Sequence, residues 1–202
     1  MSKKKFDSPE FYNKKLYETE NFAVIPDKCP IVEGWLLIIP KKQILSYGYL
    51  QQTALYNELE ALLDYVGKVV RKLYGDFVIF EHGAYSQDKL VGCGVDYAHI
   101  HIVPTEHNLV NELEVKYDWR QIVSLKETAN YIQNNQPYLY YRNQQNESFI
   151  TTNESIPSQL FRKAVASAMG MSDKYDWNTN SFPENLQKTI DTYKDVFNLK
   201  KE

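Results

Sequence analysis

The sequence predicts an α+β domain whose sheet is largely antiparallel. Short apolar segments that end at proline or glycine are expected to be strands. Longer segments with apolar residues three and four positions apart are expected to be helices. The two kinds do not alternate strictly along the chain, which disfavours a parallel βαβ sheet. With 202 residues and a hydrophobic fraction of 43%, the chain has enough apolar material for one well-filled core, or for one core and a small appendage.

The first half combines short strands with one long helix. Leucine and valine recur at helical spacing between residues 50 and 73, which predicts an amphipathic helix of about six turns. Gly75 follows that segment at the position of a C-terminal cap. Strands are expected at residues 22–25, 35–39, 77–80 and 98–103.

The second half carries more helix. Residues 138–141 and 148–151 flank a polar turn and are expected to pair as a hairpin. Pro183 stands where helices tend to begin. Helices are expected at residues 112–132, 158–169 and 184–197.

Composition and charge exclude several classes of protein. A net charge of −3 argues against an extended nucleic-acid surface, because such surfaces neutralise many phosphates with lysine and arginine. Cys29 and Cys93 are expected to be free thiols, since two cysteines do not imply a disulfide framework. The first residues lack the apolar segment of a signal peptide, and no apolar run is long enough to span a membrane. We therefore expect a soluble cytoplasmic protein without a membrane partner.

Two of the four histidines lie two residues apart on an expected strand. Alternate residues of a strand share a face, so His99 and His101 point the same way as Tyr97, while Ile100 and Ile102 face apolar packing. An imidazole has a free pKa near 6.5 and is largely unprotonated and nucleophilic at neutral pH. One imidazole can attack phosphorus and form a phosphoramidate, while its neighbour holds phosphate oxygens or protonates a leaving group.

A glycine-rich turn precedes the histidines. Gly92 and Gly94 flank Cys93, and such turns can direct backbone N–H groups at an anion. Phosphoryl transfer depends mainly on positioning and charge stabilisation, so this turn is a candidate phosphate cradle.

Two other interpretations of the histidine pair remain open at this point. The imidazoles could form a structural pair without chemistry. They could instead bind a metal ion, because histidine is a common ligand and carboxylates lie nearby. A cupin-like metal motif would need a later histidine, and none follows His107. The residues available to complete a metal shell are Glu81, His82, Asp96, Glu106 and His107.

The order of these segments resembles the histidine triad (HIT) superfamily. Residues 80–83 and 92–104 resemble its signature, His-φ-His-φ-His-φ-φ, in which φ is apolar. Residues 22–27 and 33–42 resemble the strand pair of that family that ends in Ile-Pro-Lys. The resemblance covers about half of the chain and implies a HIT-like fold, with a mainly antiparallel sheet and a long helix.

The resemblance also implies an activity and a set of site residues. Family members hydrolyse or transfer nucleoside monophosphate groups, generally without needing a metal, and many are homodimers. We expect no cofactor. The nucleophile falls on His99, which would carry a phosphohistidine-type intermediate, and the last triad histidine falls on His101. Asp27 falls where an acidic residue binds ribose hydroxyls, and Ile25 falls against the base. The expected partners are a nucleotide or dinucleotide substrate and a second copy of the chain.

The chain departs from the family pattern at three positions. Tyr97 replaces the first triad histidine, and Trp35 and Gln43 replace two other frequent histidines. The Tyr97 backbone carbonyl can still orient His99, so we expect a hydrolase or nucleotidyltransferase with either an altered leaving-group preference or weak turnover. His82 is a candidate third imidazole of the nucleotide site. The alternative is that His82 is a loop histidine hydrogen-bonded to its own turn. Two alternatives to the enzyme stay open: a non-catalytic protein that binds a nucleotide or RNA end, and a metal-binding His-x-His protein.

The resemblance divides the chain in two. A HIT-like nucleotide-binding domain is expected over residues 1–110, with a C-terminal extension of helices and a hairpin over residues 111–202. The extension loosely resembles that of the CwfJ-like branch of HIT proteins. Arg162 and Lys163 within it are interpreted as a solvated helix face, with contact to a phosphate as the alternative.

Overall fold

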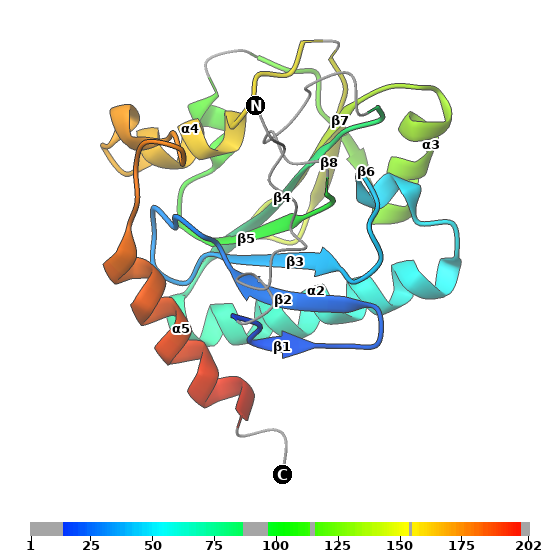
Figure 1. Cartoon of the computed structure of the whole chain (residues 1–202). Coiled ribbons are helices and arrows are strands. Elements are labelled where there is room, and N and C mark those ends of the chain that lie inside the picture. The colour runs from blue at the N-terminus through cyan, green and yellow to red at the C-terminus, as the bar shows by residue number, and fades with distance from the viewer. Residues whose placement is uncertain (1–13, 87–96, 114–115, 154, 199–202) are drawn as a thin grey trace.

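The computed structural model describes residues 14–86, 97–113, 116–153 and 155–198. Within these residues the chain forms an eight-stranded sheet in the order β1-β2-β3-β5-β4-β7-β8-β6 (Figure 1). Every strand pairing is antiparallel, which confirms the expected α+β class. The strands are β1 (Tyr17–Glu18), β2 (Phe22–Pro26), β3 (Leu36–Pro40), β4 (Phe77–Gly83), β5 (Ile100–Pro104), β6 (Arg120–Ile122), β7 (Tyr138–Arg142) and β8 (Ser148–Thr151).

Helices cover both faces of this sheet. The long helix expected between residues 50 and 73 is confirmed as α2 (Thr53–Tyr74), and Gly75 ends it with a φ of 85°. Helix α4 (Leu160–Ala168) packs on the opposite face (Figure 1). Helix α5 (Pro183–Asn198) begins at the expected proline and lies beside α2, where Tyr193 contacts Tyr74. A short helix, α3 (Thr128–Gln133), packs near β7.

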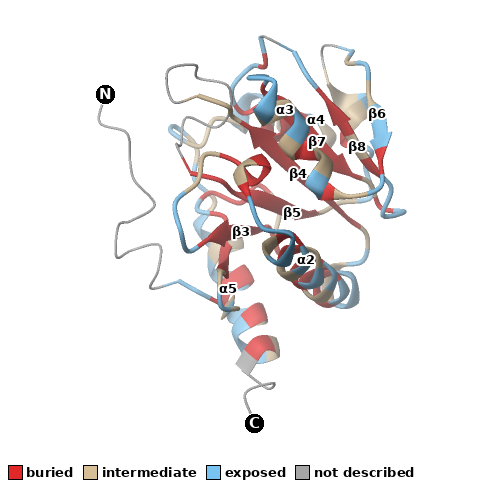
Figure 2. Cartoon of the chain, turned by 90° about the vertical axis from the view of Figure 1, so that its right-hand side faces the viewer, coloured by how far each residue is buried: buried red, intermediate tan, exposed pale blue. Residues whose placement is uncertain are grey.

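The strands divide the apolar side chains between two cores. Alternation on β5 sends Ile100 and Ile102 to the core under α2, and Val103 to the core under α4. Strands β2 to β5 and β7 are buried on both faces, whereas β6 lies at an exposed edge (Figure 2). The expected hairpin is confirmed as β7 and β8, and β7 pairs with β4. The second half of the chain therefore extends the sheet that carries the histidines.

The helix expected over residues 112–132 is wrong. The described part of this segment contains the end of a 3-10 turn at Leu109–Glu112, strand β6, a second 3-10 turn at Leu125–Glu127, and only the first five residues of α3. Residues 120–122 pair with β8, and sheet pairing outweighs the helical spacing of their apolar neighbours. Glu127 holds the next turn, because its carboxylate accepts from the Val123 N–H and pairs with Arg120.

No helix in the described part of the chain is both long enough and apolar enough to cross a membrane.

Glu81 is a buried carboxylate behind the histidines, on the α2 face of β4. It is 1% exposed, and its oxygens accept from the Tyr47 N–H at 2.8 Å and the Tyr138 hydroxyl at 2.6 Å. Burial raises its pKa from 4.5 to about 7, and the two hydrogen bonds only partly oppose this. The folded chain therefore favours the neutral acid.

We expect the free energy of unfolding to depend on pH differently in the wild type and in a Glu81→Gln variant, which lacks this titrating carboxyl. Between pH 4.5 and about 7, folded Glu81 keeps a proton that the unfolded chain releases. Relative to the variant, the wild-type free energy of unfolding should fall as pH rises, by up to about 1.4 kcal/mol per pH unit. Urea unfolding of both proteins across this interval measures the effect. A difference between the two proteins that stays constant with pH would contradict it.

Candidate histidine site

Three imidazoles gather on the α4 face of the sheet, where β4 and β5 meet. The rings of His99 and His101 lie 4.9 Å apart between centroids, so the expected same-face arrangement is correct. Phe80 pairs with His101 across the two strands, which brings His82, two residues further along β4, beside His99. All three side chains are buried, at 7% exposure for His82, 9% for His99 and 3% for His101.

His99 lies directly before β5 and is oriented by the backbone. Its Nδ1 is 2.7 Å from the carbonyl oxygen of Tyr97. A carbonyl only accepts hydrogen bonds, so the neutral ring carries its proton on Nδ1 and its lone pair on Nε2. The Tyr97 carbonyl thus makes the contact with His99 that was expected of it. The Tyr97 hydroxyl instead donates to the Pro40 carbonyl at 2.5 Å.

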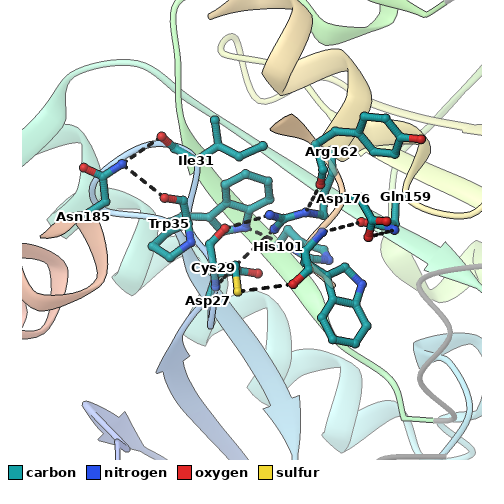
Figure 3. Close-up of polar contacts among 12 residues, drawn as sticks. Asp27, Cys29, Ile31, Trp35, His101, Gln159, Arg162, Asp176 and Asn185 are labelled. Carbon is teal, nitrogen blue, oxygen red and sulfur yellow. Dashed lines mark hydrogen bonds and ion pairs between the residues drawn. The ribbon is translucent and has the colours of Figure 1, made fainter. Parts of the chain in front are cut away.

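His101 has the opposite tautomer. Its Nδ1 accepts from the Trp35 indole N–H at 3.0 Å, so its own proton lies on Nε2 (Figure 3). That Nε2 has no hydrogen-bond partner among the described residues. Trp35 is one of the residues at which the sequence departs from the family pattern that it resembles, and its N–H fixes the ring of His101. The site thus combines a lone pair on His99 with a donor on His101.

Burial keeps the three imidazoles neutral at physiological pH. Removal from water lowers the pKa of His82 from 6.5 to about 3, with a smaller contribution from the charge of His99. Burial also lowers the pKa of His99, although the Tyr97 carbonyl and the Asp27 carboxylate oppose this. Burial lowers the pKa of His101 well below its ordinary value, and the neighbouring histidines and Arg162 add to the effect. A neutral imidazole is the form that can act as a nucleophile.

A His82→Phe variant should lose less stability than the wild type when the pH is lowered. Below pH 6.5 the unfolded chain protonates His82, whereas the folded chain keeps it neutral down to about pH 3. The wild type should therefore lose up to about 1.4 kcal/mol of stability per pH unit relative to the variant as pH falls. Phenylalanine suits the site because His82 packs edge-on against Phe80 and Phe161. Equal pH slopes for the two proteins in urea unfolding would refute the assignment.

Asp27 and Arg162 form a buried ion pair beside the histidines. The Arg162 Nη1 lies 3.1 Å from Asp27 Oδ1, which also accepts from the Cys29 N–H at 2.8 Å (Figure 3). Arg162 is 3% exposed, so its interpretation as part of a solvated helix face is wrong. Its guanidinium carbon lies over the Trp35 ring, 4.9 Å from the ring centroid. Lys163, next along the helix, lies over Tyr175 at 4.9 Å.

The remaining expected residues have different positions. Ile25 is 1% exposed and belongs to the apolar layer of the α4 face. The candidate cradle at Gly92 and Gly94 lies outside the described residues, as does Cys93. Cys29 is a buried free thiol, as expected.

Of the described residues named for a metal shell, only His82 lies beside His99 and His101. Glu81 faces α2, and Glu106 and His107 lie on an exposed turn, while Asp96 falls outside the described residues. Across the described ranges, no group of three or more His, Cys, Asp or Glu side chains is arranged to hold a metal ion.

Comparison with known proteins places the same segments in one family. A model of the family described as the HIT domain matches residues 8–108. An uncharacterised HIT-like protein of Chlamydia muridarum is 36% identical over 92 residues, which are 44% of this chain and 68% of that protein.

Two solved structures are also similar. A HIT-like protein from Bartonella henselae, described as involved in cell-cycle regulation, has a TM-score of 0.41 and 18% identity over 67% of this chain and 98% of that one. A hypothetical histidine triad nucleotide-binding protein from Sulfolobus tokodaii has a TM-score of 0.39 and 24% identity over 60% of this chain and 78% of that one.

Proposed function

Because the chain belongs to the HIT domain family, we propose that it binds nucleotides and hydrolyses or transfers a nucleoside-linked phosphate, with His99 as nucleophile. The observation that carries the proposal is the hydrogen bond from His99 Nδ1 to the Tyr97 carbonyl, which leaves the lone pair on Nε2. Burial supports the same role, because it keeps the ring neutral and reactive at pH 7. A cytoplasmic location and a homodimer stay expectations.

The proposed reaction has two displacements. His99 Nε2 attacks phosphorus, and the bond from phosphorus to the leaving group breaks. The Nε2–H of His101, which Trp35 orients, donates a hydrogen bond to a phosphoryl oxygen and keeps its proton, because a neutral imidazole that lost it would become an anion. The leaving group takes its proton from water. A water molecule or another acceptor then attacks the phosphorus, the bond from nitrogen to phosphorus breaks, and the acceptor's proton passes to the solvent.

The second candidate is a protein that binds nucleotides without turning them over. It is favoured by the side chain of Tyr97, whose hydroxyl donates to the Pro40 carbonyl rather than standing as a third triad imidazole. In this case His99 and His101 would contact phosphate oxygens and no bond would break. The two candidates share a binding site and differ only in turnover.

Calorimetry and a turnover assay separate the two candidates. Nucleoside monophosphates are first titrated into the purified chain. The chain is then incubated with nucleoside monophosphates linked to an amine, to a carboxylate and to a second nucleotide, and release of the monophosphate is measured. The proposal expects binding and turnover of at least one linkage. Binding without turnover of any linkage would favour the second candidate, and absence of both would refute both.

A further inference from the structure

We propose that Arg162, supplied by the C-terminal extension, is a positioning residue that orients Asp27 toward the hydroxyl groups of a ribose. The inference rests on the proposed function, because it concerns the ribose end of the same nucleotide site. It assigns a task in substrate recognition to α4, an element beyond the segment that matches the HIT domain.

The contacts of Asp27 leave one carboxylate oxygen available. Both the Cys29 N–H and Arg162 Nη1 donate to Oδ1, at 2.8 Å and 3.1 Å. Oδ2 accepts no hydrogen bond from the described residues. A carboxylate oxygen held in place with vacant lone pairs can accept from vicinal hydroxyl groups. The charge of Asp27 also raises the pKa of His99, so this carboxylate and the proposed nucleophile lie within electrostatic range.

Arg162 is fixed more firmly than an ion pair alone requires. Its Nε donates to the Tyr175 carbonyl at 3.1 Å and its Nη2 to the Cys29 carbonyl at 2.7 Å (Figure 3). The planar guanidinium thus bridges α4, the loop after β2 and the segment around Tyr175. A fork of this kind directs hydrogen bonds along set directions, which the point charge of a lysine does not. Arg162 therefore determines where Asp27 Oδ1, and hence Oδ2, is held.

The Arg162 guanidinium also supports the part of the site around His101, where the phosphate is proposed to bind. It stacks on the Trp35 ring, and the Trp35 N–H donates to His101. One arginine thus contacts both the carboxylate proposed for the ribose and the indole that orients His101, the proposed hydrogen-bond donor to the phosphate. The spacing between these two groups is set by a residue of the extension.

A second layer of the extension holds the segment that Arg162 contacts. Gln159 Nε2 donates to Asp176 Oδ1 at 3.1 Å, and Gln159 Oε1 accepts from the Trp177 N–H at 3.2 Å (Figure 3). Gln159 has a left-handed backbone with a φ of 60°. Strain of this kind persists only where surrounding contacts hold it. We attribute the left-handed backbone of Gln159 to the need to place Arg162, three residues later, against Asp27.

The test compares ribonucleotides with 2′-deoxyribonucleotides. AMP, GMP and their 2′-deoxy analogues are titrated calorimetrically into the wild type and an Arg162→Lys variant. The wild type should prefer the ribonucleotide by about tenfold or more, the effect of one hydrogen bond to a charged group. In the variant this ratio should fall to about threefold or less, through loss of ribonucleotide affinity. Combining Arg162→Lys with Asp27→Asn should lower the ratio no further than Asp27→Asn alone.

Arg142→Lys is the matched control. Arg142 is also buried, at 8% exposure, and paired with Glu60, but it lies on the α2 face of the sheet. This variant should keep the wild-type ratio. If Arg162→Lys does not fold, Gln159→Asn replaces it, because asparagine tolerates the left-handed backbone but is too short to hold Asp176. That variant should lower the ratio in the same direction.

Three outcomes would overturn the inference. Equal losses of affinity for both sugars would indicate a general structural role for Arg162. A gain in ribonucleotide affinity would indicate that Arg162 blocks the ribose site. A wild type that binds nucleotides with no preference for ribose would remove the role of Asp27 while leaving the nucleotide site intact. A wild type that binds no nucleotide would refute the proposed function itself.

Discussion

Replacing His99 with glutamine is expected to lower kcat by at least about a thousandfold on any substrate that the wild type turns over. Glutamine has an amide in place of the imidazole nitrogen and cannot form the phosphoramidate. Its carboxamide can still donate to the Tyr97 carbonyl, so the local backbone should keep its geometry. Steady-state kinetics with matched thermal unfolding curves measures the effect.

His107→Gln is the control for this prediction. His107 is exposed and lies on the turn after β5, away from the histidine cluster. It should keep the wild-type kcat and thermal midpoint. A His99→Gln variant with wild-type turnover would eliminate His99 as nucleophile, whatever the family of the chain.

A Phe161→Ala variant is expected to lose about 3–5 kcal/mol of stability, the range for truncation of a buried aromatic side chain. Phe161 is fully buried, and its ring stacks on Phe80 at 4.5 Å between centroids and contacts Tyr141 at 5.8 Å. Phe161 also contacts the histidine face, because its ring lies 5.4 Å from that of His82. Urea unfolding at neutral pH measures the loss.

The same variant should change the histidines. A cavity at position 161 admits water to the face of His82, so the pKa of this ring should rise from about 3 toward 6.5. A nuclear magnetic resonance titration of the imidazole protons records this shift. Met169→Ala, at the exposed end of α4, should change neither quantity, since Met169 is 44% exposed. Retained stability in Phe161→Ala would contradict the role of α4 as the cover of this face.

The histidine face could be predicted from the sequence because its cause is local. Strand periodicity alone places His99 and His101 on one side and Ile100 on the other, and the structure confirms this alternation. Helix α2 could be predicted for a similar reason, since one continuous apolar stripe and Gly75 define it. The tautomer of His99 follows from a carbonyl two residues away.

The ion pair between Asp27 and Arg162 could not be predicted in this way. The two residues are separated by 135 positions, and nothing in the pattern around Arg162 distinguishes a buried arginine from a solvated one. One signal was present: Arg162 directly follows Phe161 and comes two residues before Ala164, and the structure buries all three. The helix predicted over residues 112–132 was wrong for a related reason. Strand β6 forms there because it pairs with β8, and this tertiary interaction cannot be read from the local sequence.

The stereochemistry at phosphorus tests most directly whether His99 attacks phosphorus before water does. A substrate with a chiral phosphorothioate at the nucleoside-linked phosphorus is hydrolysed in isotopically labelled water, and the configuration of the product is determined. Two successive displacements through His99 predict net retention of configuration. Net inversion would show that water attacks directly, and would contradict the account.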